Sequence, residues 1–286
     1  MPPQPDGDCL HKPLMHWRLD LNPSDIETLE RATVDAVAPD AVLALPGWLL
    51  PIDGGTIGRA HSAVPLQHPH TPDAQAHQTA QLADIVAVYR LQGRAPAFRL
   101  PDTATHLHHA LTRMGFGRVE PSWVMVGSVV ALAQTPSPAL PEGLQVVAQP
   151  HATPGWQAVF LGPGFDPVDG ANRVRNLSRA PGTVFVSAVV GGETVACGTA
   201  SFGQGWLGVH GMRTAQSHRG QGLAAAILRS MATEAAQRKT HRVFLQVGAA
   251  NTPALSLYAK AGLVQAWPYA YWRVGRDSCK KPQKRT

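Results

Sequence analysis

A glycine-rich turn at residues 217–224, with the sequence SHRGQGLA, constrains the fold of this chain more than any other segment. It follows a strand-like run over 206–213 and opens a helix-like run that ends near Lys239. A helix that begins directly after such a turn forms an anion site, because its first backbone N–H groups have no intrahelical partner and its dipole adds partial positive charge. Gly220 and Gly222 have no Cβ and let a phosphate approach the backbone closely. The sequence therefore predicts that the second half of the chain binds a phosphorylated cofactor.

The elements around the turn separate the classes of phosphate-binding protein. A P-loop has Lys and then Ser or Thr after its glycines, whereas Leu223 and Ala224 follow here. A dinucleotide-binding fold has its turn after the first strand of a parallel sheet. This turn instead follows three strand-like runs that short glycine turns join into an antiparallel meander, at 183–190, 194–202 and 206–213. Both of these classes are therefore disfavoured.

The composition indicates a globular chain of one large or two medium domains, since 44% of its 286 residues are hydrophobic and 15% are charged. The sequence has no run of about 18 apolar residues that could cross a membrane. Residues 1–13 are proline-rich and lack the apolar core of a signal peptide. The three cysteines are too few and too scattered for a disulfide framework or a zinc site. We therefore expect a cytoplasmic protein with a disordered N-terminus and no metal.

The formal net charge is +6, and part of it lies in a basic tail at 276–286. A positive balance suits nucleic acid, and it equally suits a ligand that carries several phosphates. A run of like charge at a chain end is usually a solvated tail. We expect no nucleic acid and no membrane among the partners, and a monomer or a homodimer in solution.

Residues 134–142 carry three prolines and few apolar side chains, which is typical of a linker between domains. The predicted domains are 14–133 and 143–275. In the first domain, Asp53-Gly54-Gly55 between two apolar runs predicts a hairpin turn. The helices are expected after Ser24 and at 74–89 and 103–114, and the strands at 45–52, 56–66, 97–100 and 122–132.

The second domain shows a fuller version of the same order. A strand at 144–148 and two helical stretches precede the meander, and the helix after the turn carries an apolar stripe at helical spacing. A further strand, a helix capped by Asn251 or Thr252 and a final strand region complete the domain. The two helices before the meander are predicted at 156–161 and 168–179, and the further strand at 243–247. The last helix is predicted at 252–262 and the final strand region at 263–274.

The region 206–262 resembles the GCN5-related N-acetyltransferase (GNAT) family in both motif and order. The family's turn motif matches Arg219-Gly220-Gln221-Gly222-Leu223-Ala224. Downstream, Asn251, Tyr258 and Gly262 stand at the family's spacing, although Leu263 takes the place of the family's usual Phe. The resemblance implies a mixed α/β fold, with a mostly antiparallel sheet flanked by helices, and acetyl-CoA as the cofactor.

The resemblance also implies the cofactor contacts. In the family, the pyrophosphate lies on backbone N–H groups of the turn and the first helical residues, here Arg219, Gly220, Gln221, Gly222, Leu223 and Ala224. The pantetheine arm pairs with the preceding strand, here around Met212, Arg213 and Thr214. The splay between that strand and the strand at 243–247 admits the thioester. Asn251, at the start of the last helix, is included among the cofactor-binding residues.

Tyr258 is the candidate acid that protonates the departing thiolate, because the family places a Tyr on this helix within reach of the sulfur. The alternative is a Tyr that packs under the sheet with its hydroxyl bound to the backbone. The resemblance does not identify the general base, since the strand 206–213 lacks the Glu that many family members carry there. His210 lies on the same strand face as Trp206 and Gly208 and titrates in the right range. A structural His with a water relay is the alternative.

The first domain has a shorter version of the same element order and no such turn. Its segment Arg59-Ala60-His61-Ser62 resembles the front half of certain two-domain bacterial acetyltransferases, which carry Asn at the position of His61. We therefore expect tandem acyl-CoA N-acyltransferase-like domains, of which the first is degenerate, has lost cofactor binding and walls the acceptor site. The alternative is a structural cap without substrate contact. His106, His108 and His109 lie on a predicted helix without the further ligands of a metal site.

The sequence thus predicts an N-acetyltransferase that moves an acetyl group from acetyl-CoA to a primary amine by direct attack on the thioester. The missing carboxylate on the strand 206–213 keeps a second hypothesis open, a non-catalytic acyl-CoA-binding regulatory module. The acceptor stays unassigned: a small amine, an aminoglycoside, an amino acid and a protein N-terminus all fit the sequence.

Overall fold

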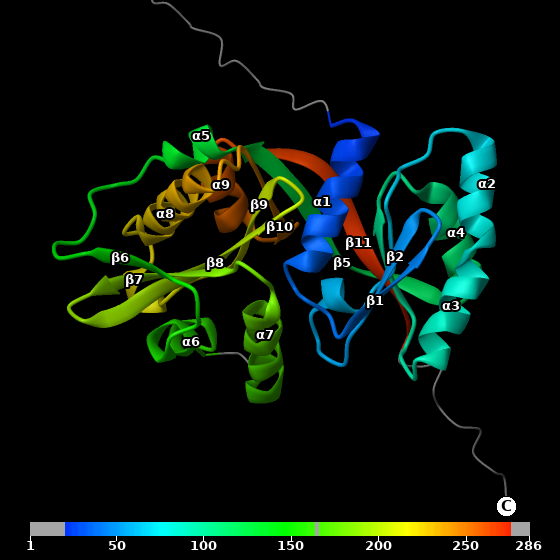
Figure 1. The fold of residues 1–286 in the computed structure, drawn as a ribbon, viewed down its shortest axis with the longest axis horizontal. Helices are drawn as coiled ribbons and strands as arrows, with labels where there is room; N and C mark the ends of the chain where they lie inside the picture. The colour runs from blue at the N-terminus through cyan, green and yellow to red at the C-terminus, as the bar shows by residue number, and fades with distance from the viewer. Residues whose placement is uncertain (1–20, 164–165, 276–286) are drawn as a thin grey trace, which may run out of the picture.

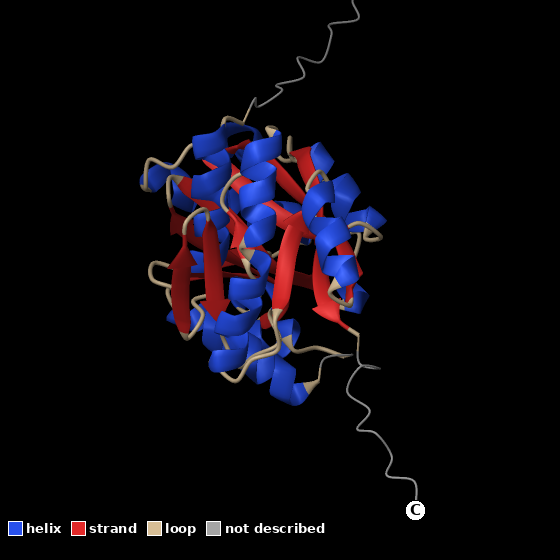
Figure 2. Cartoon of the chain, turned by 90° about the vertical axis from the view of Figure 1, so that its right-hand side faces the viewer, coloured by secondary structure: helices blue, strands red, loops and turns tan. Residues whose placement is uncertain are grey.

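The computed structural model describes residues 21–163 and 166–275, so the predicted disordered N-terminus and the basic tail lie outside the described residues. One eight-stranded sheet runs through the molecule in the order β4-β11-β5-β10-β9-β8-β7-β6 (Figure 1). Figure 2 shows helices on both faces of this sheet. The strands β9 and β10 pair in parallel, and the other neighbours in the described sheet pair antiparallel. This mixed, mostly antiparallel α/β architecture confirms the predicted fold class.

The second half of the chain forms the antiparallel meander that the sequence predicts. Its three strands are β7 (Val184–Val190), β8 (Glu193–Gly203) and β9 (Trp206–Thr214), and β6 (Gln145–Gln149) pairs with β7 at the edge of the sheet. Two helices, α6 (Pro154–Phe160) and α7 (Pro167–Arg179), connect β6 to β7. After β9 come the short turn η2 (Gln216–His218), α8 (Leu223–Gln237), β10 (Arg242–Gly248) and α9 (Thr252–Lys260). These bounds follow the predicted ranges closely, because strand alternation and helical periodicity are strong local signals.

Strands from the two halves of the chain alternate at one end of the sheet. β5 (Phe116–Ser128), from the first half, lies between β10 and the last strand, β11 (Val264–Val274). β11 in turn lies between β5 and β4 (Ala97–Pro101), so it pairs with two strands of the first half. The two predicted domains therefore share one sheet. Their boundaries stay a prediction, and the proposed linker at 134–142 contains no helix or strand.

A small second sheet forms in the first half from β1 (Ala41–Leu45), β2 (Trp48–Ile52) and β3 (Val64–Pro65). The predicted hairpin forms between β2 and β3, which pair antiparallel, but residues 53–63 connect them, so Asp53-Gly54-Gly55 is not a tight turn. The tight turn lies between β1 and β2, at Pro46 and Gly47. Gly47, with φ +80°, supplies the positive φ that a two-residue hairpin turn needs. The side chain of Asp53 is instead buried and bonded within the protein.

The helices of the first half are α1 (Pro23–Asp35), α2 (Pro72–Ala80), α3 (Leu82–Leu91), α4 (Thr105–Arg113) and α5 (Val129–Ala133), with a 3-10 turn η1 (Gly58–Ala60) before β3. α1 begins at a capping box, in which the side chains of Asn22 and Asp25 each accept a hydrogen bond from the other's backbone N–H. α5 corrects the predicted strand over 122–132. Ser128 ends that strand because its hydroxyl caps a helix by accepting from the Ala131 N–H.

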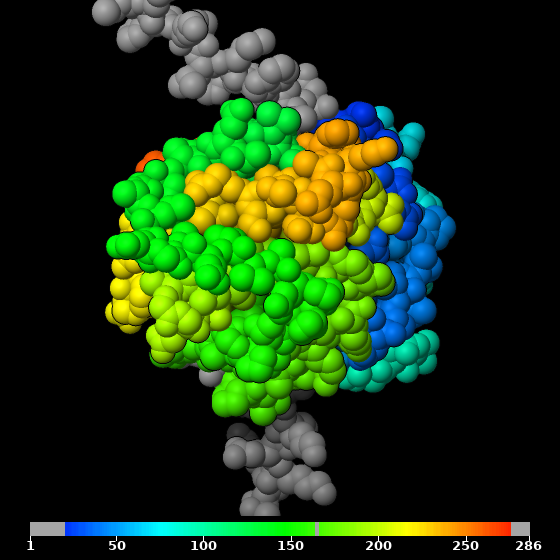
Figure 3. Space-filling view, turned by 60° about the vertical axis from the view of Figure 1, so that its left-hand side comes forward, coloured from blue at the N-terminus to red at the C-terminus, as the bar shows by residue number. Residues whose placement is uncertain are grey.

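Side chains of β9 alternate between two cores, one on each face of the sheet. Leu207 and Val209 belong to the core beneath α8, whose outer side forms the yellow to orange band across the surface in Figure 3. Trp206 and His210 lie on the opposite face, where the rings of both contact Phe244. This face is covered by α1, which contributes to the same core. The predicted grouping of Trp206 with His210 on one strand face is therefore confirmed.

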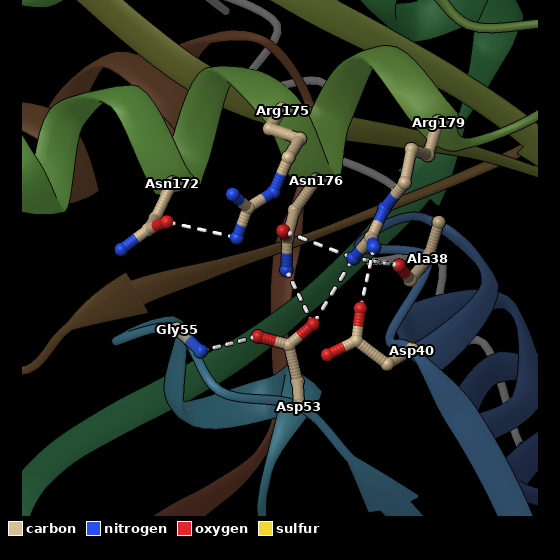
Figure 4. Close-up of polar contacts among 8 residues, drawn as sticks. All are labelled: Ala38, Asp40, Asp53, Gly55, Asn172, Arg175, Asn176 and Arg179. Atoms are coloured by element: carbon tan, nitrogen blue, oxygen red, sulfur yellow. Dashed lines mark hydrogen bonds and ion pairs between the residues drawn. The ribbon is translucent and has the colours of Figure 1, made fainter.

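An ion-pair cluster joins α7 to the first half of the chain (Figure 4). Asp53 Oδ2 accepts from Arg179 Nη2 at 3.0 Å and from Asn176 Nδ2 at 3.2 Å. Arg179 Nη1 also donates to Asp40 Oδ1 at 2.6 Å. Asp53 Oδ1 accepts from the Gly55 N–H at 2.6 Å, so both oxygens of the buried carboxylate are satisfied. We call this cluster of Asp53, Asp40, Asn176 and Arg179 the Asp53 clamp.

Candidate active site

The predicted phosphate turn lies between β9 and α8. Gly220 and Gly222 have φ values of +77° and +75°, a region that glycine adopts without steric cost. Gly222 is the N-cap of α8, and no side chain of the described residues caps the first N–H groups of this helix. A Cβ on Gly222 would lie 2.2 Å from Ser137 Oγ, so a larger residue there would require Ser137 to shift. The turn has the geometry of an anion site at a helix start.

A groove of about 620 Å³ opens beside this turn, bounded by the end of β9 and the start of α9. Among its lining residues are nine of the ten predicted cofactor-binding residues: Met212, Arg213, Thr214, Arg219, Gly220, Gly222, Leu223, Ala224 and Asn251. Gln221, the tenth, is not one of them, and its side chain donates to the Ser217 carbonyl at 3.5 Å. The fold thus brings residues that are up to 39 positions apart (251 − 212) into one groove.

β9 and β10 diverge beside the groove. Their parallel pairing ends at Val209 opposite Leu245. Gly211, with φ +59°, lies where the register between β8 and β9 shifts, which is a bulge. Among the described residues, β9 from His210 to Thr214 therefore has a strand neighbour only on its β8 side. A strand edge of this kind is where an extended ligand can add by backbone hydrogen bonds.

The side chain of Arg213 binds protein carbonyls. Its guanidinium donates to the carbonyl oxygens of Phe160, Gly162 and Pro163, at 3.0, 3.2 and 2.8 Å. These carbonyls lie at the end of α6 and just after it, so Arg213 holds the beginning of the α6–α7 connection against β9. Any contact of this residue with the cofactor is expected from its main chain.

Tyr258 lies on α9, and its ring belongs to the core beneath α8. Burial raises the pKa of Tyr258 to about 12, so the phenol is protonated at neutral pH. A neutral phenol is the form that can donate a proton to a thiolate. Ser256 and Leu257, beside it in the chain, line the groove, and Tyr258 itself is 7% exposed. The role of Tyr258 as the acid stays a prediction.

His210 is buried on β9, and both of its ring nitrogens have partners. Arg59 Nη1 lies 3.1 Å from Nδ1, and Ser201 Oγ lies 2.9 Å from Nε2. Because a guanidinium only donates, Nδ1 accepts, and Nε2 then carries the proton that it donates to Ser201. Burial, and after it the charge of Arg59, holds the pKa of His210 well below its usual value. The imidazole is therefore neutral, with its lone pair bound by Arg59, and its role as the base stays a prediction.

A family model described as "Probable histone acetyltransferase Rv0428c C-terminal" matches residues 23–272. The match includes the shared sheet, the glycine turn and both helices that border the groove. The chain belongs to this acetyltransferase family. Its membership places the chain in the GNAT superfamily, as the turn and the downstream Asn, Tyr and Gly positions indicate.

Solved GNAT structures share the fold of this Rv0428c-type chain. A GCN5-related N-acetyltransferase from Kribbella flavida has a TM-score of 0.66 at 16% identity, over 87% of this chain and 95% of that one. A tandem GNAT protein from the clavulanic acid biosynthesis pathway has a TM-score of 0.57 at 13% identity, over 87% and 95%. A GCN5-related N-acetyltransferase from Sphaerobacter thermophilus reaches 0.51 at 19% identity, over 88% and 93%. These likenesses show the fold alone, and they confirm the predicted tandem class. A search of the curated proteins found no match.

A polar network at the splay has no counterpart among the sequence predictions. Arg59 Nη1 donates to Gln246 Oε1 at 2.6 Å, and Gln246 Nε2 donates to Thr33 Oγ1 at 2.9 Å. Arg59 comes from η1 and Thr33 from α1, so the first half of this Rv0428c-type chain reaches β9 and β10 where they diverge. The segment that contains Arg59 marked the resemblance to two-domain acetyltransferases, but no local pattern indicates its contact with a strand over 180 residues later. The contact supports the hypothesis that the first half walls the acceptor site.

Two of the three α4 histidines have separate partners. His106 Nε2 lies 3.1 Å from Gln78 Oε1, and the ring of His108 stacks on Trp272 with the centroids 4.8 Å apart. Within 21–163 and 166–275, no group of three or more His, Cys, Asp or Glu residues could hold a metal ion. In the same two ranges, no helix combines the length and the apolar character needed to cross a bilayer.

Proposed function

We propose that this chain transfers the acetyl group of acetyl-CoA to a primary amine of an acceptor. The observation that carries the proposal is the edge of β9 beyond Val209, which pairs with no described strand on its β10 side and leads from the glycine turn into the splay. Coenzyme A has the two groups that such a surface recognises, a pyrophosphate for the helix start and an amide-bearing arm for the strand edge. Membership in an acetyltransferase family supports acetyl as the acyl group.

The residues around the groove fit coenzyme A in chemistry as well as in shape. The first N–H groups of α8, from Leu223 onward, supply donors for the pyrophosphate. Arg219 and Lys260 line the same groove and add positive charge beside them. On the side away from β8, where no described strand pairs with it, the main chain at Met212 can exchange hydrogen bonds with the amides of the pantetheine arm.

The transfer begins with a neutral amine, because an ammonium has no lone pair. The amine nitrogen bonds to the thioester carbon, negative charge develops on the carbonyl oxygen, and the C–S bond then breaks. A backbone N–H near Met212 can stabilise that oxygen, and removal of such a donor typically costs about 100-fold or more in rate. We assign to Tyr258 the proton that the thiolate takes up as it leaves.

The proton of the acceptor amine has two routes, through His210 or through water. In the tautomer that the Arg59 contact requires, His210 can accept a proton only if Arg59 leaves Nδ1, so we propose that water takes the proton. We expect His210→Gln to change kcat/KM by less than about tenfold, with a pH profile that follows the acceptor amine in both proteins. A rate loss of about 100-fold or more, together with loss of a limb between about pH 5 and 7, would identify His210 as the base.

A second function is favoured by one observation. The strand β9 carries no carboxylate, and the lone pair of its only histidine is bound by Arg59. A chain with such a strand can bind an acyl-CoA without turning it over, and it would then act as a regulatory module.

Thiol release from acetyl-CoA separates the two functions. The full chain is assayed with a panel of primary amines, and its thermal unfolding is followed with and without acetyl-CoA. We expect acetyl-CoA to raise the unfolding temperature and at least one amine to stimulate thiol release. Stabilisation without turnover on any amine would support the regulatory module, and the absence of both would reject the coenzyme A site.

A further inference from the structure

Arg59 lies at the point where β9 and β10 begin to diverge. Its Nη1 is 2.6 Å from Gln246 Oε1 and 3.1 Å from His210 Nδ1. Gln246 and His210 are the residues directly after Leu245 and Val209, the last parallel pair of the two strands. The guanidinium therefore marks the apex of the splay, on the face that Trp206 and His210 share and that α1 covers.

The positive charge of Arg59 has no carboxylate partner within the described residues. Both groups that it contacts, a glutamine oxygen and an imidazole nitrogen, are neutral. Two other guanidinium groups act on it through their charge, and each of these has its own carboxylate: Arg99 pairs with Glu30, and Arg173 pairs with Asp169. Burial lowers the pKa of Arg59, which shows that its environment disfavours the charge. A half-buried cation in such surroundings is stabilised when an anion binds beside it.

The remaining donors of Arg59 define which anion fits. Nε and Nη2 make no hydrogen bond to any described residue, and the side chain keeps part of its surface exposed. These two nitrogens form one edge of a planar fork, which matches the two oxygens of a carboxylate in a bidentate pair. A single guanidinium also balances a carboxylate charge for charge.

We propose that the acceptor amine carries a carboxylate, and that Arg59 binds this carboxylate and so places the amine at the splay. The inference rests on the proposed acetyltransferase function and names its substrate class, an amino acid or a peptide with a free carboxylate near the amine. The charge of Arg59 supports this choice against a lysine-rich peptide, because a guanidinium without a carboxylate partner in the described residues repels a cationic acceptor. Arg59 acts here as a binding residue and takes part in no proton transfer.

A purely structural role for Arg59 makes a different prediction. If its function were only to fasten η1 to β9 and β10, its loss would weaken turnover of every acceptor by a similar factor. If Arg59 binds a carboxylate, its loss affects acceptors that differ only in that group to different extents. The ratio of kcat/KM between matched acceptors is therefore the decisive measurement.

The test compares amino acids and short peptides with their C-terminal amides, which keep the amine but lose the carboxylate charge. For the wild-type chain we expect a preference for the acids of at least about tenfold in kcat/KM. Arg59→Met should bring that ratio close to one, and Arg59→Lys should leave an intermediate ratio because ammonium lacks the fork. Arg94→Met, which removes an exposed arginine without a contact at the splay, is the matched control and should keep the wild-type ratio.

A binding measurement keeps this proposal separate from the acetyltransferase proposal. N-acetyl-amino acids and their amides are the probes, and the shift of the unfolding temperature is compared between wild type and Arg59→Lys. Stabilisation by the acids alone, lost in the variant, would uphold the carboxylate site even if no amine released thiol. Equal effects of acids and amides in both assays would overturn the carboxylate site, and would leave the acetyltransferase proposal standing if thiol release occurs.

Discussion

Burial acts on Tyr258 and His210 in opposite directions and leaves both uncharged. It raises the pKa of the phenol to about 12 and lowers the pKa of the imidazole, so each side chain is neutral near pH 7. The neutral phenol retains a proton that it can donate. The neutral imidazole has its lone pair bound to Arg59 and its proton bound to Ser201. At the scale of single residues, the structure therefore favours Tyr258 over His210 as a participant in proton transfer.

We expect Tyr258→Phe to lower turnover by about 100-fold, the usual contribution of general acid catalysis, because the thiolate would leave without a proton donor. The affinity for acetyl-CoA should change little, since the variant removes one oxygen from a side chain with little exposed surface. Steady-state kinetics with a reactive amine, together with calorimetric binding of acetyl-CoA, measures both quantities.

Tyr89→Phe is the control for this prediction. Tyr89 is also buried, and its hydroxyl donates to the Pro51 carbonyl at 3.0 Å in the core of the first half. Its loss should reduce stability by about 1 kcal/mol without changing turnover. Turnover that is unaffected by Tyr258→Phe would assign Tyr258 to packing.

Some residues of the site belong to a sequence motif, whereas others come together only in the folded chain. The turn, Asn251 and Tyr258 belong to a short motif, so the sequence identifies them together. Arg59 and Gln246 carry no such signal, because their pairing depends on how η1 packs against a strand far along the chain. The sequence also could not predict the hydrogen bonds of His210. Its residue type and strand position indicate a base, but they do not indicate the two partners that bind its ring nitrogens.

At the scale of elements, the glycine turn requires its glycines for two different reasons. Gly220 and Gly222 share a positive φ, which costs a residue with a Cβ about 1–2 kcal/mol. A Cβ on Gly220 would meet nothing within 4 Å, whereas one on Gly222 would lie 2.2 Å from Ser137 Oγ and 3.1 Å from Pro138. The second glycine therefore also permits residues 137–140 to pack against the start of α8.

We expect Gly222→Ala to lower the free energy of unfolding by more than Gly220→Ala does. Gly220→Ala should cost only the backbone strain, about 1–2 kcal/mol. Gly222→Ala adds the displacement of the neighbouring chain, for a further cost of about 1–3 kcal/mol. Urea unfolding of both variants measures the difference. Equal losses would show that residues 137–140 move aside without cost.

The sequence predicts elements well where the pattern is repeated within the element. The strands β7 to β9 and the helices α8 and α9 have clear alternation or helical spacing, and their observed bounds lie close to the prediction. The tight turn of the first half was misplaced because Asp53-Gly54-Gly55 has the composition of a turn, while its carboxylate belongs to a cluster with α7. The pairing of β5 with β10 and β11 was not predicted, because strand order depends on contacts between distant parts of the chain.

At the scale of the whole molecule, the Asp53 clamp joins the two halves outside the shared sheet. We expect Asp53→Ala to lower the free energy of unfolding by about 2–4 kcal/mol, because it removes a buried acceptor that Arg179 and Asn176 share, although Arg179 keeps its ion pair with Asp40. The value lies below that of a fully buried pair, since Arg179 is 35% exposed. Asp40→Ala is the matched control, because Asp40 is 48% exposed and an exposed ion pair contributes at most about 1 kcal/mol. Similar losses in the two variants would show that burial of Asp53 adds nothing.

Stability should also depend on pH, because burial lowers the pKa of several histidines. These are His61, His68, His106, His108 and His210. In the unfolded chain they take up protons near pH 6.5, and in the folded chain only at lower pH. The unfolded state therefore binds more protons below about pH 6.5, so stability is fully present above that pH and falls as the pH is lowered.

His68, with a pKa of about 4, gives this prediction its sharpest test. It should contribute a loss of up to about 1.4 kcal/mol per pH unit between about pH 6.5 and 4. We expect the unfolding temperature to be lower at pH 5.5 than at pH 7.5, and His68→Gln to reduce that difference. A stability that is constant or higher at the acidic pH would contradict the prediction.

Because β5 lies between two strands of the second half, the sheet cannot be completed while the first half is being synthesised. While a ribosome synthesises the chain, β5 is complete long before β10 and β11, the neighbours on both of its sides, exist. The nascent first half therefore presents unpaired strand edges, which promote association with other chains until the last strand emerges. The eleven-residue strand β11 fills the gap between β4 and β5, so the sheet of the first half is completed only when this strand has been made. Cutting the gene at residues 134–142 would thus yield two incomplete sheets rather than two domains.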